Sequence, residues 1–184
     1  ELAARKVAEY AEKLLLGVAA SYAYGGGTVY GYTNHTGRIT KTITAPTASG
    51  WSGRTLLTEV LDMKSLSHAD FHFGPWVLYT SPDWDEYLDD DFSTAKGDVT
   101  LRERIKKIEG LEDVRTLDFL TGWNIILVQM TSDVVREVVG MEPTTVQWET
   151  HGGMQLNFKV MAILVPQIRI DFNSNTGVVH GNTV

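Results

Sequence analysis

The segment from residue 154 to residue 172 constrains the fold more than any other part of the sequence. Apolar and polar side chains alternate over residues 154–160, an uninterrupted apolar run occupies 160–165, and the alternation resumes after Pro166. A period of two is typical of a β-strand with one covered face, whereas an apolar run predicts cover on both faces. We therefore predict a long strand, bent at Pro166, that passes from a half-exposed region into a fully covered one.

The rest of the sequence mixes helical and strand patterns, which predicts an α+β fold. Helical spacing of apolar residues is present at 2–16 and 55–67, a helix is expected to begin at Ser81, and a capping box formed by Thr100 and Glu103 opens another that ends at Gly110. Short strands are predicted at 75–79, 114–120 and 125–130. A short helix is also predicted at 132–139, although its four valines are weak helix formers.

A β-hairpin is predicted at residues 28–44. Three glycines precede it, the turn sequence Asn34-His-Thr-Gly37 separates two β-type runs, and Pro46 follows. An isolated two-stranded hairpin is marginally stable in water, so this one must lie on its own domain or on a neighbouring chain. The sequence leaves both possibilities open.

Composition excludes several classes of protein. The 184 residues include no cysteine, which rules out a disulfide scaffold, a thiolate zinc site and a cysteine nucleophile. No apolar stretch approaches the roughly 18 residues of a membrane span. The net charge of −7 argues against a dedicated nucleic-acid binder.

Two groups of side chains are candidates for chemistry, and neither predicts an enzyme. His68 and His72 have the spacing of a paired metal site on a helix, but structural histidines near a turn are the favoured interpretation. Asp83, Asp85, Glu86 and residues 89–91 form an acidic cluster whose paired carboxylates could catalyse hydrolysis, although a solvated acidic surface is favoured. We predict no catalytic residue, no metal and no cofactor.

Three stretches, in this order, resemble the Hong Kong 97-type major capsid protein of tailed bacteriophages and its relative, the encapsulin nanocompartment shell protein. Residues 29–38 resemble the start of the family's extended loop. Residues 74–83 resemble its "Gly-Pro-aromatic" strand, and Gly140-Met-Glu-Pro143 with the strands at 146–170 resembles its late strands. The resemblance implies an N-terminal arm helix (1–17), an extended loop (18–50), a peripheral domain with a long helix (51–73 and 141–184) and an axial domain (74–140).

The resemblance also implies which residues touch neighbouring subunits. Basic residues of the arm would face packaged DNA or a cargo protein: Arg5, Lys6 and Lys13. Residues of the extended loop would form an assembly interface: Tyr30, Tyr32, Asn34, Arg38, Ile39, Lys41 and Ile43. We expect no covalent crosslink through Lys41.

The function implied is a structural protein of which many copies assemble into an icosahedral viral capsid around double-stranded DNA. It would be located in the virion and assembled in the host cytoplasm, with no membrane partner. The initial residue is Glu rather than Met, which agrees with removal of a preceding segment during maturation. Two alternatives are an encapsulin-type shell around a cargo protein and a carboxylate-dependent hydrolase using residues 83–91. A third is a monomeric binding module whose hairpin packs on its own domain.

Overall fold

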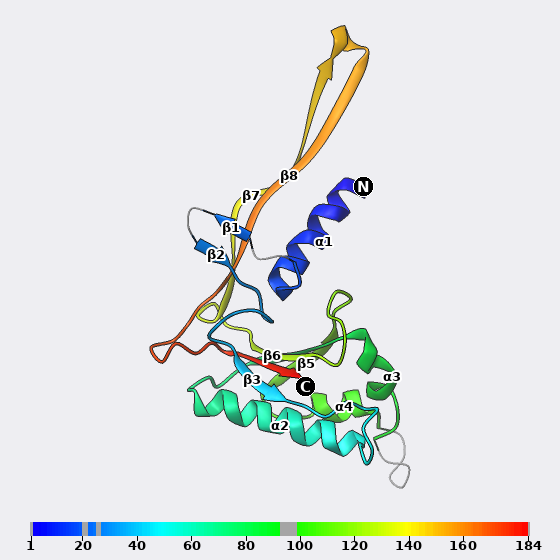
Figure 1. Cartoon of the computed structure of the whole chain (residues 1–184), viewed down its shortest axis with the longest axis vertical. Helices are drawn as coiled ribbons and strands as arrows, with labels where there is room; N and C mark the ends of the chain where they lie inside the picture. Colours follow the sequence, from blue (N-terminus) through cyan, green and yellow to red (C-terminus); the bar gives the residue numbers. More distant parts are fainter. Residues whose placement is uncertain (1, 20–21, 25–26, 93–98, 184) are drawn as a thin grey trace.

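The computed structural model describes residues 2–19, 22–24, 27–92 and 99–183. A long hairpin projects from a base built on a five-stranded sheet (Figure 1). The base contains β3 (Ile39–Thr42), α2 (Gly53–Ala69), β4 (Trp76–Thr80), η1 (Pro82–Trp84), α3 (Asp85–Leu88), α4 (Leu101–Lys106), β5 (Leu111–Thr116), β6 (Ile125–Gln129) and β9 (Val178–Asn182). The projecting part contains α1 (Leu2–Leu16), β1 (Tyr22–Tyr24), β2 (Gly27–Val29), β7 (Val135–Thr150), η2 (His151–Gly153) and β8 (Gln155–Ile168).

Strand β4 organises the base. The sheet has the order β3-β9-β6-β4-β5, with β4 parallel to β5 and antiparallel to β6, and with β9 antiparallel to β6 and parallel to β3. Every residue of β4 is buried. Because successive side chains point to opposite faces, Trp76 and Leu78 enter one apolar cluster while Val77 and Tyr79 enter another. The sheet is therefore covered on both sides.

Helices α2 and α4 cover one face of the sheet (Figure 1). α2 buries Leu56, Leu57, Val60 and Met63, which are spaced three or four residues apart along one side of the helix. Burial of such side chains contributes roughly 25 cal/mol for each Å² of apolar surface removed from water. None of the described helices is long and apolar enough to cross a membrane.

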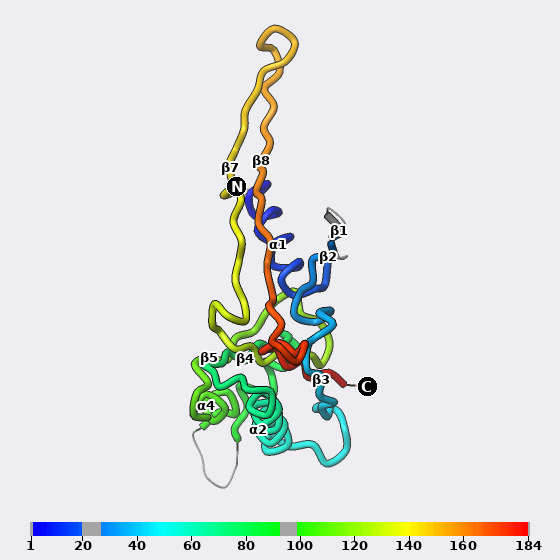
Figure 2. The backbone as a smooth tube through the Cα atoms, turned by 90° about the vertical axis from the view of Figure 1, so that its left-hand side faces the viewer, coloured from blue at the N-terminus to red at the C-terminus, as the bar shows by residue number. Residues whose placement is uncertain are grey.

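The opposite face of the sheet holds the roots of the projecting part. Leu16 at the end of α1, Tyr32 in the following segment and Ile168 at the end of β8 pack in one cluster against Val77 and Tyr79. Both α1 and the hairpin are therefore anchored to the same apolar layer of the base. Figure 2 shows them rising from it side by side.

Residues 31–33 close the C-terminal end of α1. The backbone N–H groups of Tyr32 and Thr33 donate to the carbonyls of Leu15 and Leu16 over 2.9 and 3.1 Å, and the Thr33 hydroxyl also donates to the Leu16 carbonyl. These bonds satisfy carbonyls that have no partner within the helix. The approach is close, since a Cβ built on Gly31 would lie 2.2 Å from the backbone nitrogen of Gly17.

The hairpin of β7 and β8 is the longest element of the structure. Its strands pair from Val135↔Ile168 to Thr150↔Gln155, with irregular register between Val139 and Thr144. At roughly 3.3 Å per residue, the 16 residues of β7 extend about 50 Å. Residues 152 and 153, both glycines with positive φ, turn the chain at the tip.

Most predicted elements are confirmed, and the long strand predicted from residue 154 corresponds to β8. The helix predicted at 2–16 is α1 and has the same bounds. The helix predicted at 55–67 corresponds to α2, and the strand predicted at 75–79 corresponds to β4. The helix predicted at 132–139 is wrong: residues from Val135 onward form β7, in agreement with the strand preference of their β-branched side chains. The full cover predicted for 160–165 is also wrong within this chain, since Ile163 and Val165 are exposed.

The hairpin predicted at 28–44 does not form. β2 pairs with β1, whereas β3 pairs in parallel with β9 at the far end of the sequence. The apolar residues of β3 pack into the core beneath the sheet, where Ile43 is buried and Ile39 partly buried. A tertiary partner distant in sequence thus replaces the local partner that the turn signal predicted.

The core also crosses one of the predicted domain boundaries. A division at residue 73/74 would separate α2 from β4, yet Leu57 and Met63 share one buried cluster with Trp76 and Leu78. The structure places residues 39–92, 99–129 and 178–182 in the base. The hairpin of β7 and β8 projects from it as a separate element (Figure 1).

Replacing Gly31 with Ala tests whether the close packing at the end of α1 holds the projecting part in place. The added methyl group would overlap the backbone of residue 17, so we expect Gly31→Ala to lower the free energy of unfolding by about 1–3 kcal/mol in denaturant titrations. Gly53→Ala is the matched control, because the nearest atoms to its Cβ would be in the side chains of Leu101 and Phe92, at ordinary distances of 3.5 and 3.6 Å. Equal stability of the two variants would contradict this account.

Candidate assembly surface

The apolar residues predicted to contact a neighbouring subunit are largely used within the chain. Tyr32 and Ile43 are each 3% exposed. The ring of Tyr32 stacks on that of Tyr79 with centroids 6.3 Å apart, and burial raises the pKa of the Tyr32 hydroxyl. Tyr30 is partly buried and meets the His35 ring edge-on. Tyr32 and Ile43 are therefore core residues, and their prediction as interface residues is corrected.

The polar residues of the same predicted interface also have partners in the chain. Asn34 accepts a hydrogen bond from the Gly31 backbone N–H over 2.7 Å, and Lys41 forms an ion pair with Asp62 at 3.0 Å. Arg38 donates to the His35 carbonyl over 2.8 Å. Two of these contacts stabilise the segment between β2 and β3 internally, and the ion pair joins β3 to α2.

The basic residues predicted on the arm line α1. Arg5 and Lys6 both pair with Glu9, at 3.1 and 2.6 Å, and the Lys6 hydrogen bond lowers the pKa of the Glu9 carboxyl. Lys13 lies over the ring of Phe119, 4.5 Å from its centroid. The arm therefore exposes positive charge chiefly at Arg5 and Lys6, whose side chains are largely in solvent.

The largest apolar surface on the described residues lies on the hairpin, which the sequence analysis did not select. Cross-strand partners point to the same face, so Glu149, Leu156 and Phe158 belong to one face and Lys159 and Met161 to the other. Large apolar side chains are exposed along its length: Val138, Val139, Val146, Trp148, Met154, Leu156, Phe158, Ile163 and Val165. The signal was present in the sequence as the apolar run at 160–165, which implies cover that the chain itself does not supply.

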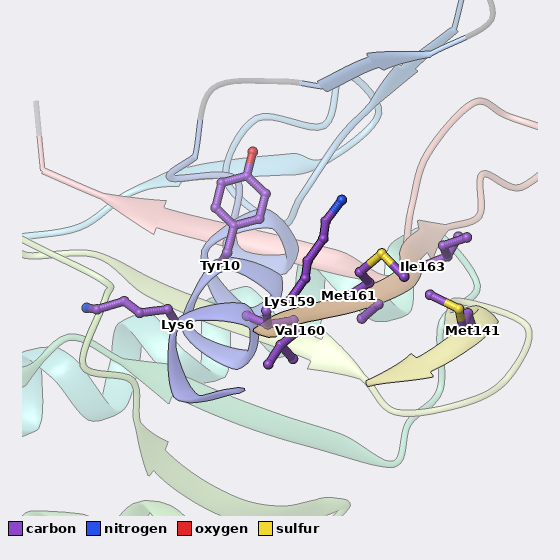
Figure 3. A pocket seen from close by; sticks show the side chains of 9 residues that line it. Lys6, Tyr10, Met141, Lys159, Val160, Met161 and Ile163 are labelled. Carbon is purple, nitrogen blue, oxygen red and sulfur yellow. The ribbon is translucent and has the colours of Figure 1, made fainter. Parts of the chain in front are cut away.

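A cleft of about 680 Å³ lies between α1 and the hairpin. Val7 and Tyr10 form one wall, and Met141 and Met161 belong to the other. Lys159 extends from β8 on the same side as Tyr10, while Lys6 lies at the opposite end of the group (Figure 3). The cleft is thus apolar at its centre and carries an ammonium group on each wall.

Both groups of residues considered for chemistry have structural roles. The Arg102 guanidinium bridges Asp85 and Asp89, at 2.7 and 2.8 Å, and Thr116 donates to the same Asp85 oxygen. His68 packs on the ring of Trp76. Within the described residues, no group of three or more metal-ligating side chains is brought together.

A polar cluster joins the segment before β3 to the last strand. His180 of β9 lies between the Arg38 guanidinium, which donates to its Nδ1 at 3.4 Å, and Asn124, whose Oδ1 is 3.0 Å from its Nε2. Acceptance at Nδ1 requires a neutral ring with its proton on Nε2. Burial, reinforced by the charge of Arg38, lowers the pKa of His180 to about 4.

Three solved structures share this architecture. The capsid of Myoviridae phage XM1 aligns with 100% of this chain and 65% of its own, at a TM-score of 0.69 and 11% identity. A virus-like particle from Pyrococcus furiosus aligns with 80% and 57%, at a TM-score of 0.63 and 17% identity. A structure from Mycobacterium phage Che8 aligns with 98% and 59%, at a TM-score of 0.57 and 12% identity. The chain spans about three fifths of the length of these neighbours.

These alignments define the fold as the Hong Kong 97-type capsid fold, which confirms the resemblance found in the sequence and its α+β class. Residues 1–181 match the family of unknown function DUF6260, and the chain belongs to that family. Comparison with curated protein sequences finds no match.

The His180 cluster predicts acid sensitivity. The folded state holds this imidazole neutral down to about pH 4, whereas the unfolded chain binds the proton below about pH 6.5, so stability falls as the pH drops between these values. We expect the wild type to lose up to about 3 kcal/mol more than His180→Gln over this range. Urea titrations at pH 7 and pH 4.5 measure the difference.

The control for this prediction is His151→Gln, which replaces an exposed histidine at the hairpin tip. It should lose as much stability on acidification as the wild type does. If His180→Gln also follows the wild-type pH dependence, the assignment of a neutral His180 is incorrect.

Proposed function

We propose that this chain is the structural subunit of a closed shell, and that many copies assemble into an icosahedral viral capsid enclosing double-stranded DNA. The observation that carries the proposal is the projecting hairpin, which exposes large apolar side chains on a fold shared with a phage capsid. The virion is the corresponding location.

Within the part of the chain that the structure describes, the hairpin lacks partners for its strand edges and for several of its apolar side chains. A two-stranded ribbon has two open edges with unpaired backbone groups, and isolated hairpins are marginally stable in water. Trp148, Leu156 and Phe158 remain exposed on its distal half. Exposed apolar surface of this kind marks sites of protein association. Copies of the same chain arranged around a shell would cover it repeatedly.

Within such a shell we assign the base to the axial domain and α1 with the hairpin to the peripheral domain. Continuous packing of α2 with β4 supports a single unit for the base. The arm, extended-loop and domain boundaries implied by the sequence resemblance differ from this assignment chiefly at α2 and at residues 28–44.

A shell that encloses a cargo protein is the second candidate. The likeness to a virus-like particle from Pyrococcus furiosus supports it. Arg5 and Lys6 would face DNA in the first case and an acidic cargo surface in the second. A hydrolase based on residues 83–91 has less support, since Asp85 and Asp89 are held by Arg102.

Size-exclusion chromatography followed by negative-stain microscopy tests the proposal. We expect uniform closed particles of megadalton mass. An absorbance ratio at 260 and 280 nm typical of nucleic acid would identify a genome container, whereas a co-purifying protein would identify a cargo shell. A chain that stays monomeric in high salt and with crowding agents would contradict both.

Polar substitution on the hairpin should separate assembly from folding. We expect Leu156→Ser with Phe158→Ser to abolish particles, while the denaturant midpoint of the base changes little because neither side chain contacts its core. Gln147→Ser is the matched control, since residue 147 pairs with Phe158 across the hairpin and this substitution removes no apolar side chain. Particles formed by the double variant would show that this surface is not needed for assembly.

A further inference from the structure

The tip of the hairpin and the cleft beside α1 have complementary chemistry. At the tip, Met154 is 93% exposed, and the apolar side chains of Leu156 and Phe158 follow it on β8. The Glu149 carboxylate lies at the same end, 3.6 Å from where a Cβ on Gly153 would be. The tip is therefore an apolar projection with one negative charge.

The cleft has the opposite features. Met141 and Met161 contribute flexible, polarisable side chains to it, and Tyr10 contributes an aromatic ring (Figure 3). Methionine adapts its shape to an inserted side chain and makes favourable contacts with aromatic rings. Lys159 supplies a positive charge that has no ion-pair partner among the described residues, whereas Lys6 is paired with Glu9. An apolar side chain accompanied by a carboxylate fits this cleft.

The charges of the hairpin are not balanced within one copy. Among the described residues, neither Glu149 nor Lys159 forms an ion pair. They cannot pair with each other, because Glu149 is opposite Leu156 on one face and Lys159 is opposite Val146 on the other. Their complementarity can be used only between molecules.

The tip also cannot reach the cleft of its own chain. Met154 and Met161 are seven residues apart on an extended strand, which separates them by roughly 23 Å. Every copy therefore presents one tip and one cleft that must each find a partner elsewhere. A second copy supplies both in equal number.

We infer that the hairpin tip of one copy inserts into the cleft between α1 and β8 of another copy, with Met154 beside Met141 and Met161 and with Glu149 beside Lys159. This inference rests on the proposed shell function and specifies one of its contacts.

Disulfide trapping tests the contact, since the natural chain contains no cysteine. We would assemble Met154→Cys/Met161→Cys particles, oxidise them and separate them on a denaturing gel without reductant. A disulfide needs Cα atoms within about 7 Å, so these positions can join only between copies. We expect a ladder of covalent oligomers. The control Met154→Cys/Phe172→Cys places the second cysteine at a fully exposed site outside the cleft, where it is more accessible than at residue 161, and should still give no ladder.

The outcomes separate this contact from the shell itself. Particles without a ladder, or with equal ladders in both variants, would overturn the tip-to-cleft contact and leave the shell function intact. A ladder without particles would support the contact and contradict the shell. Neither particles nor a ladder would overturn both.

Charge exchange gives a second measurement on the same background. Glu149→Lys should reduce the crosslinked fraction severalfold, because a positive charge at residue 149 would then face the ammonium group of Lys159. Adding Lys159→Glu should restore it, since the pair is then reversed. Failure of the second substitution to restore crosslinking would exclude the pairing of Glu149 with Lys159.

Discussion

Burial of both faces of β4 is the constraint on which the rest of the structure depends. Trp76 and Leu78 require the layer formed by α2 and α4, and Val77 and Tyr79 require a second layer on the opposite side. Leu16, Tyr32 and Ile168 provide that second layer. Leu16 is the last residue of α1, Tyr32 lies in the segment after it, and Ile168 is the last residue of β8. The packing that completes the core therefore also sets the direction in which α1 and the hairpin leave the base.

Because of this arrangement, the base and the hairpin differ in the contacts that stabilise them. The base contains the apolar clusters and most of the polar contacts that stabilise a single chain, including those of Arg102 and His180. The hairpin extends about 50 Å with little of its own to pack against beyond α1. The chain therefore has one part with a packed core and another part that exposes large apolar side chains to solvent.

The sequence predicted the elements of the base better than it predicted the exposed apolar surface of the hairpin. Helix α1 was predictable because its apolar residues follow a helical period, and strand β4 because it is a short apolar run with every residue buried. The segment at 28–44 was not, because its turn residues are compatible with a local hairpin while β3 pairs with β9, about 140 residues away. The apolar run at 160–165 predicted cover on both faces that the described residues do not supply, because the sequence pattern cannot tell whether a covering surface belongs to the same chain.

The position of β9 has a consequence for the order of folding. This strand follows the entire hairpin in sequence, yet it lies between β3 and β6 in the sheet. Among the strands of the described residues, β3 pairs only with β9, so it cannot join the sheet until β9 has been synthesised. During synthesis the hairpin is therefore complete before the sheet can close, and the contacts that join β3 to β9 are among the most distant in sequence, which makes closure a slow step. The sheet of the base can therefore be completed only after the hairpin, with its exposed apolar side chains, has already been synthesised.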